Sequence, residues 1–281
     1  ENPDRILIGG EDEDAMNELE KIYLNWVKKE KIIRTNLWSS ELSKLIANAF
    51  LAQRISSINS VSALCEVTGA DVNDISLAIG FDKRIGKLFL NSGPGFGGSC
   101  FKKDILNLVY ICDHYGLHTV SRYWNEVLRI NVWQQKRISS IIVEKLFGTI
   151  SDKKITILGL AFKANTNDTR ESPAIKICED LIEEGAILKI YDPKVKESQI
   201  KKLLPEKNQV NWSYYSSVLE AAYDSHAIVV LTEWGDFKDL NWTEIKKIMK
   251  NPSWVFDTRN IIDVQKAKSS GLQTWVLGQS T

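Results

Sequence analysis

The chain has 281 residues, of which 43% are apolar and 26% are charged, and its formal net charge is zero. That length supports one to three domains. The neutral balance gives no indication of a nucleic acid or a membrane surface as a partner. The four cysteines are widely spaced and match neither a disulfide nor a zinc pattern. We therefore expect a cytoplasmic protein without a secretory signal or a membrane span.

The first 36 residues predict a strand, a helix and a second strand. The strands are expected at Arg5–Ile8 and Lys31–Thr35, and an amphipathic helix is expected at Asp12–Val27. Two short strands leave the edges of a sheet open, and an open edge favours pairing with another chain. We expect residues 1–36 to be mobile or to pair with another chain.

A long helix is predicted next. It begins at Ser39 or Ser40 and continues to Cys65 without proline or glycine. About 25 residues would span roughly 37 Å. Because its apolar residues cover more than one face, it is either a core helix within the chain or a helix packed against a second copy. Lys44 and Asn48 lie one turn apart and project together from its surface.

A glycine-rich stretch follows, with four glycines from Gly93 to Gly98, and then Cys100. Glycine lets the backbone approach a ligand closely. Helical spacing after Cys100 predicts a helix that begins near Ser99, which places Cys100 in the first turn, where the helix dipole favours an anion. Asp104 lies one turn further along the same face. This pair suits a nucleophile beside an acid–base group, although an isolated cysteine is more often a small buried hydrophobe.

The helices around this stretch are predicted at Val72–Ile79, Lys103–His114 and Ser121–Phe147. Two further hypotheses use the histidines nearby. Cys112, His114 and His118 could be metal ligands, although a closed structural zinc site needs four. A cysteine hydrolase would pair Cys100 with His114 or His118, but these lie at position i+14 or beyond and cannot pair with Cys100 locally.

From Lys153 onward, strands alternate with helices. The strands are predicted at 155–158, 187–191, 228–231, 254–256 and 274–277, and a helix follows the first strand, from Ser172-Pro173 to Glu184. Such alternation indicates a parallel, doubly wound sheet, which binds ligands at the carboxyl ends of its strands. The residues at those ends include Phe162-Lys163, Asp192, 232–234 and 257–259. The predicted fold class is α/β, with an all-helical middle part followed by a Rossmann-like sheet.

Motifs along nearly the whole chain carry a resemblance to a family. They are Asn2–Arg5, Trp38–Lys44, Ala47–Arg54, the Gly95–Cys100 sequence GFGGSC with Phe101-x-Lys103-Asp104, Gly159–Lys163, Asn167–Ser172, Tyr191–Pro193 and Phe256–Arg259. Together they resemble the UDP-glucose/GDP-mannose dehydrogenase family. No Gly-x-Gly-x-x-Gly lies between a strand and a helix here, so the resemblance implies the later part of a longer enzyme. It implies a remnant of an N-terminal NAD-binding domain at 1–36, a helical dimerisation domain at 37–150 and a Rossmann-like UDP-sugar-binding domain at 151–281.

The resemblance implies that the primary alcohol of UDP-glucose is oxidised to the carboxylate of UDP-glucuronate, with two NAD⁺ used in succession. Cys100 would form a thiohemiacetal and then a thioester, and Asp104 would position or deprotonate the water that hydrolyses it. Lys44 and Asn48 would stabilise the oxyanion. The implied substrate-binding residues are Arg84 (across a dimer), Phe89, Gly97, Phe162, Lys163 and Arg259. The implied NAD-binding residues are Lys103 and Arg170.

The resemblance also implies a homodimer through the helical domain, and it leaves higher oligomers open. Asn91 departs from the lysine that is common at this position in animal members, which weakens any charge contact there. The alternative hypothesis is a catalytically incompetent dimerising fragment that retains only UDP-sugar binding.

Overall fold

The structure is a computed structural model that describes residues 3–204 and 211–280. Residues 1, 2 and 281, the outer limits of the first and last expected domains, lie outside the described residues. The strands are β1 (Ile6–Gly9), β2 (Ile32–Thr35), β3 (Lys154–Leu158), β4 (Ile187–Tyr191), β5 (Trp212–Tyr214), β6 (Ala227–Val230), β7 (Trp254–Asp257) and β8 (Gln273–Val276). The α-helices are α1 (Glu13–Tyr23), α2 (Leu37–Thr68), α3 (Val72–Gly80), α4 (Phe101–His114), α5 (His118–Lys145), α6 (Pro173–Glu183), α7 (Glu197–Leu203), α8 (Val218–Ala222), α9 (Trp242–Ile248) and α10 (Val264–Ser269).

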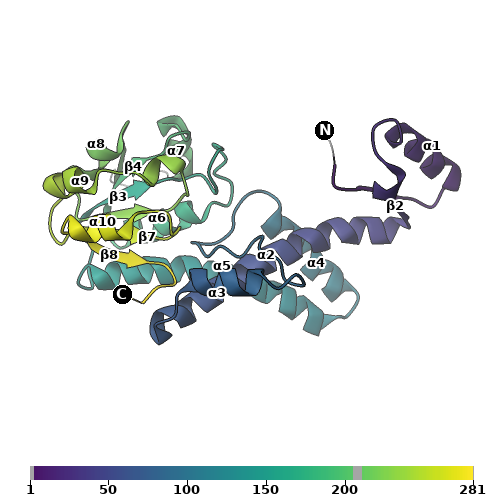
Figure 1. Cartoon of the computed structure of the whole chain (residues 1–281), viewed down its shortest axis with the longest axis horizontal. Coiled ribbons are helices and arrows are strands. Elements are labelled where there is room, and N and C mark those ends of the chain that lie inside the picture. Colours follow the sequence, from purple (N-terminus) through teal and green to yellow (C-terminus); the bar gives the residue numbers. More distant parts are fainter. Residues whose placement is uncertain (1–2, 205–210, 281) are drawn as a thin grey trace.

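The N-terminal strand–helix–strand unit is confirmed. β1 and β2 pair in parallel, and α1 connects them. The helix is shorter than predicted, because Asp12 caps its start and the side-chain amide of Asn25 bonds to the carbonyls of Lys21 and Ile22 at its end. In Figure 1 this unit lies at the far end of α2 from the large sheet. The expected mobility of the segment stays a prediction.

The long helix α2 begins earlier than predicted. Asn36, not Ser39 or Ser40, is its N-cap, because the Asn36 side chain accepts a hydrogen bond of 2.7 Å from the Ser39 amide. Such a cap stabilises a helix by about 1 kcal/mol. The helix ends at Gly69, which has a φ of 82°. Its 32 residues span roughly 48 Å, so α2 reaches from the N-terminal unit to the large sheet (Figure 1).

The middle of the chain is helical, as predicted. The core between α2, α4 and α5 includes Ala49 and Ala52 of α2, Ile105 of α4 and Val127 of α5. Ala49 and Ala52 lie about one turn apart on α2, and their small side chains let the other helices approach its backbone closely. Helix α4 begins at Phe101, between the two predicted starts near Ser99 and at Lys103. Helix α5 begins three residues before its predicted start, because the chain reverses within the short segment after His114.

The C-terminal part is a six-stranded parallel sheet in the order β5-β4-β3-β6-β7-β8, which confirms the α/β fold class. The last four residues of its central strand β3, Ile155, Thr156, Ile157 and Leu158, are completely buried. Burying one such aliphatic side chain contributes about 1.5–3 kcal/mol. The sequence pattern missed the edge strand β5, which is only three residues long. Helices cover both faces of the sheet (Figure 1).

Asp192 closes the turn after β3 from the end of the neighbouring strand β4. Its carboxylate accepts hydrogen bonds from the amides of Leu160 (2.7 Å) and Ala161 (3.2 Å) and from the indole of Trp234 (3.3 Å). Its second oxygen accepts from the amides of Lys194 and Val195. The predicted ligand position at this strand end is therefore filled by the protein's own carboxylate.

None of the helices in residues 3–204 and 211–280 combines the length and the apolar character that crossing a membrane requires.

His226, at the start of β6, joins the sheet through its ring. Its Nδ1 accepts a hydrogen bond of 3.1 Å from the Lys154 amide, while its own amide donates to the Lys154 carbonyl. Burial lowers the pKa of His226 from its ordinary value, and the nearby charges of Lys250 and Lys153 lower it further. Protonation would convert Nδ1 from an acceptor into a donor facing another donor.

We predict that His226 makes the fold less stable in mild acid. Because folding lowers the pKa of His226, its contribution is fully present above the unfolded value of about 6.5 and is lost as the pH falls through the folded pKa. His226→Asn keeps an acceptor for Lys154 but cannot be protonated. Between pH 7.5 and 5.5, the Tm of the parent should fall by on the order of 2 °C more than the Tm of this variant. Equal falls would contradict the prediction.

Candidate active site

A buried carboxylate lies between α2 and α4. The side chain of Asp104, on α4, is 1% exposed. Its Oδ2 accepts a hydrogen bond of 2.6 Å from the Asn48 amide and lies 3.9 Å from the Lys44 ammonium. Asp104 Oδ1 is also buried and has no hydrogen-bond partner among the described residues. The structure thus brings Lys44, Asn48 and Asp104 together and leaves one carboxylate oxygen available.

Cys100 lies at the N-cap of α4, one position before the first turn in which the sequence pattern placed it, and Ser99 is not the cap. The Asp104 amide donates a 2.8 Å bond to the Cys100 carbonyl, so the two residues bracket the first turn. The Cys100 side chain is exposed, whereas Cys65, Cys112 and Cys178 are buried. A substrate can therefore approach the exposed thiol of Cys100 from the solvent side. The carboxylate of Asp104 is buried and faces the interior of the site.

Buried side-chain amides hold the first half of the glycine loop, Gly93–Gly98. The Gly93 amide donates to Asn59 of α2 (2.8 Å), and its carbonyl accepts from Gln134 of α5 (3.1 Å). Asn131 bonds to both the amide and the carbonyl of Phe96. Gly95 has a φ of 130°, and a Cβ there would lie 2.6 Å from Asn131. These three amides were not among the predicted site residues; the signal in the sequence was polar residues at core positions of otherwise apolar helix faces.

The second half of the loop contacts the sheet part of the chain. The Gly98 amide donates a 2.8 Å bond to the Arg170 carbonyl. A Cβ at Gly97 would lie 2.5 Å from the Glu171 carbonyl oxygen and 2.9 Å from Phe162 Cβ. Gly97 therefore permits a close approach of two backbone segments, and this geometric role is added to the substrate contact that its sequence context predicts.

Arg259, after β7, is held tightly at the carboxyl edge of the sheet. Its guanidinium lies 3.1 Å from Glu233 and donates to the carbonyls of Leu231 (2.8 Å) and Phe162 (3.3 Å). Burial lowers the pKa of Arg259, and the charges of Glu233 and Asp257 oppose that change. A cavity of about 370 Å³ adjoins it and is lined by Asn73, Asn91, Ser92, Glu233, Lys238, Arg259, Asn260 and Ile261. We call this cavity the Arg259 pocket.

The other cations predicted for the site are exposed. Lys163 lies 5.4 Å from the centroid of the Phe162 ring, and Lys103 projects from the first turn of α4. Arg170 pairs with Asp168 at 2.6 Å, which lowers the pKa of that carboxyl. The same ion pair raises the pKa of Arg170, and the Arg170 carbonyl accepts the hydrogen bond from Gly98, two residues before Cys100.

Arg84 and Phe89 lie on a separate loop. Arg84 pairs with Asp82 at 2.6 Å, and no contact in the described part of the chain joins it to Asp104 or the glycine loop. Phe89 has a φ of 61°. Arg54 of α2, which sequence analysis missed, clamps this loop by donating to the carbonyls of Ile85, Gly86 and Leu88 at 2.7–2.9 Å.

The histidines lie away from the thiol. His114 is at the opposite end of α4 from Cys100, roughly 20 Å along the helix, and it contacts the rings of Tyr110 and Tyr115. His118 lies 3.2 Å from Asp113. Within the described ranges there is no group of three histidine, cysteine or acidic side chains placed to hold a metal ion. The geometry gives no support to the metal and cysteine-hydrolase hypotheses.

Comparison with known proteins places these features in one family. The family model for the UDP-glucose/GDP-mannose dehydrogenase family, central domain, matches residues 38–133, and the model for the UDP binding domain of the same family matches residues 156–264. The chain is 50% identical to a UDP-glucose 6-dehydrogenase of Drosophila melanogaster and to one of Caenorhabditis elegans. Each match covers 99% of this chain but only 61% and 60% of those relatives.

Solved structures give the same result. A UDP-glucose dehydrogenase from Pyrobaculum islandicum superimposes with a TM-score of 0.84 at 29% identity, over 100% of this chain and 60% of that one. A UDP-D-ManNAc dehydrogenase from Pyrococcus horikoshii gives 0.79 at 29% identity, over 97% of this chain and 59% of that one. The chain thus spans about 60% of the length of the relatives it matches. From its two matched segments, which together cover most of its length, and from its fold, the chain belongs to the UDP-glucose/GDP-mannose dehydrogenase family.

Proposed function

We propose that the chain supplies the catalytic and UDP-sugar-binding parts of an NAD-dependent UDP-glucose 6-dehydrogenase, which oxidises UDP-glucose to UDP-glucuronate with two NAD⁺. The observation that carries this proposal is the buried carboxylate of Asp104, with Asn48 and Lys44 beside it, one helical turn from the exposed thiol of Cys100. Four free cysteines fit a cytoplasmic enzyme.

The second oxidation needs a covalent step at Cys100. After the first hydride transfer has given an aldehyde, the Cys100 thiolate adds to its carbonyl carbon, and a thiohemiacetal forms. Loss of the second hydride gives a thioester, and water then releases the carboxylate and restores the thiol. Lys44 and Asn48 stabilise the oxyanion on the sugar carbon. The unpartnered Oδ1 of Asp104 is the group that receives the proton of the attacking water.

Substrate binding is assigned to groups on both sides of the glycine loop. Arg259 in its pocket and Lys163 offer charge-assisted donors to the diphosphate. The nucleotide and the sugar are enclosed by Phe162, Phe89 and the backbone at Gly97. We propose that Arg84 serves the site of a second subunit, which agrees with its position away from Asp104.

NAD⁺ supplies the hydride acceptor in both oxidations. The exposed cations Lys103 and Arg170 fit a dinucleotide diphosphate, because they carry positive charge at the solvent side of Cys100. Residues 1–36 are assigned as a remnant of the NAD-binding domain, 37–150 as the dimerisation domain and 151–281 as the UDP-sugar-binding domain.

The dimer is proposed through α2. Phe50, Leu64 and Val67 are apolar side chains of this helix that are 54%, 60% and 81% exposed. Val67 also lines a groove of about 870 Å³ between α2 and α5. A second copy of the chain is the occupant that this combination fits. The alternative function, a dimerising fragment that retains only UDP-sugar binding, draws support from the share of the relatives that the chain covers.

Calorimetric titration with UDP-glucose and, separately, with NAD⁺ tests the proposal. UDP-glucose should bind, and Arg259→Met should weaken binding at least about tenfold, because a hydrogen bond to a charged group contributes about 1.5–3 kcal/mol. Arg122→Met, which removes an exposed cation that donates to Thr119, is the matched control. UDP-glucose binding without NAD⁺ binding would favour the fragment alternative, and no UDP-glucose binding would contradict both.

Alkylation tests the thiol. Iodoacetamide should label Cys100 at least tenfold faster than Cys65, Cys112 or Cys178, because only Cys100 is exposed. Saturating UDP-glucose should slow the labelling. Peptide mass spectrometry measures each site, and equal rates at all four thiols would count against the assigned geometry.

The covalent step makes a prediction about stoichiometry. When the chain is extended with the segment of a relative that it does not match, the parent should form two NADH per UDP-glucose, measured by absorbance. Cys100→Ser should form at most about one, because it cannot pass the aldehyde level. Cys112→Ser, in the core, should still form two. Two NADH from the Cys100→Ser protein would refute the thioester.

A further inference from the structure

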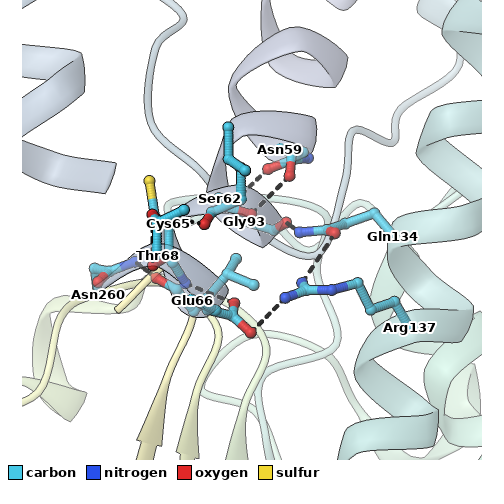
Figure 2. A network of polar contacts seen from close by, with 12 residues as sticks. Asn59, Ser62, Cys65, Glu66, Thr68, Gly93, Gln134, Arg137 and Asn260 are labelled. Atoms are coloured by element: carbon cyan, nitrogen blue, oxygen red, sulfur yellow. Dashed lines mark hydrogen bonds and ion pairs between the residues drawn. The ribbon is translucent and has the colours of Figure 1, made fainter. Parts of the chain in front are cut away.

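A closed ring of polar contacts joins the helical part of the chain to the sheet part. It passes through the glycine loop, α5, α2 and the turn after β8, and Figure 2 shows most of its side chains. Two of its neighbouring members, Ser92 and Asn260, also line the Arg259 pocket. The ring therefore connects the two walls of that pocket by a route through Glu66 and Arg137, which also line the groove between α2 and α5.

The first half of the ring holds the glycine-loop wall. The Gly93 carbonyl accepts from Gln134 Nε2, and Gln134 Oε1 accepts a 3.4 Å bond from Arg137. Arg137 forms an ion pair with Glu66 of α2, and the two side chains are only 14% and 13% exposed. One guanidinium thus connects α5 and α2 directly below the loop (Figure 2).

The second half holds the wall on the sheet. Glu66 uses its other oxygen to accept a 2.9 Å bond from the Gly278 amide, in the turn after β8. In the same turn, the Leu277 carbonyl accepts from Asn260 Nδ2 at 3.0 Å. Asn260 Nδ2 is 3.5 Å from Ser92 Oγ, and Ser92 precedes Gly93, which closes the ring.

We propose that Glu66 and Arg137 are positioning residues that fix the distance between the two walls of the Arg259 pocket and thereby tune the affinity for the UDP-sugar. The ion pair lies on the side of the ring opposite the pocket, and each partner serves one wall: Arg137 through Gln134, and Glu66 through Gly278. This inference rests on the proposed function for its ligand, but its geometry is independent of it.

An ion pair is suited to this position because loss of either charge leaves the other half-buried and unpaired. The unpaired side chain turns toward water and releases the bond it made to its own wall. Network residues outside a binding site change the coupling to it by about 2- to 30-fold. Arg137→Lys keeps the charge but lacks the planar fork that reaches two acceptors, so it should fall between the parent and Arg137→Met.

The end of the glycine loop nearest Cys100 is held by contacts that do not belong to the ring. Asn131 fixes both backbone groups of Phe96, and the Arg170 carbonyl fixes Gly98. Opening the ring should therefore loosen Asn91–Gly95 while Cys100 stays in place. This difference separates a positioning role from a general loss of stability, which would affect both ends.

The test compares Glu66→Gln, Arg137→Met and Arg137→Lys with the matched control Glu126→Gln, which breaks an exposed ion pair on α5. We expect the Kd for UDP-glucose, from calorimetry, to rise at least about fivefold in Glu66→Gln and Arg137→Met, less in Arg137→Lys and not in the control. The rate of Cys100 alkylation should stay within about twofold of the parent. An unchanged Kd, or a parallel change in Kd and alkylation rate, would overturn the proposal.

Amide hydrogen exchange keeps the test independent of the ligand. Peptides over residues 89–96 and 273–280 should exchange faster in Glu66→Gln than in the parent, and peptides over 97–104 should not. If the parent fails to bind UDP-glucose, the proposed function fails, while this exchange pattern still supports the ring. Unchanged exchange at both walls would overturn the ring as a positioning device, whatever the chain binds.

Discussion

A backbone segment that crosses the interior outside any helix or sheet must still find partners for its amide and carbonyl groups. The glycine loop meets this constraint with side-chain amides from two long helices, Asn59 of α2 and Asn131 and Gln134 of α5. The candidate site depends on that solution, because α2 supplies Asn59 to the loop and also carries Lys44 and Asn48. The glycine loop is thus positioned against the same helix as these two side chains, while the Asp104 carboxylate reaches them from α4.

The sequence pattern was sufficient for elements whose signal is local. The long apolar helix, the alternating strands of the sheet and the i, i+4 relation of Lys44 and Asn48 all depend on neighbours in the chain. The cluster of these two residues with Asp104 was reached through the family resemblance. The start of α2 was missed because a single cap decides it, the side chain of Asn36, which lies before the apolar pattern begins.

What could not be predicted depends on contacts between distant residues. Glu66 and Gly278 are 212 positions apart in the sequence. Arg54 of α2 donates hydrogen bonds to a distant loop at residues 85–88. A glutamate or an arginine in a helix does not by itself indicate a contact with a distant backbone segment, because such side chains are more often solvated. The exposed position of Cys100 beside a fully buried Asp104 is likewise a property of packing.

The hydrogen bonds of Asp192 bear on where a nucleotide can bind to this sheet. In a dinucleotide-binding domain, the turn after the first strand offers its amides to a pyrophosphate, and an acidic residue after the second strand receives a ribose. Here the acid after the second strand of the sheet is bonded to the amides after the first. The amides of this turn are thus already bonded to a carboxylate of the same domain. A nucleotide entering that turn would have to compete with a tethered carboxylate, which leaves the Arg259 pocket as the open position at this edge of the sheet.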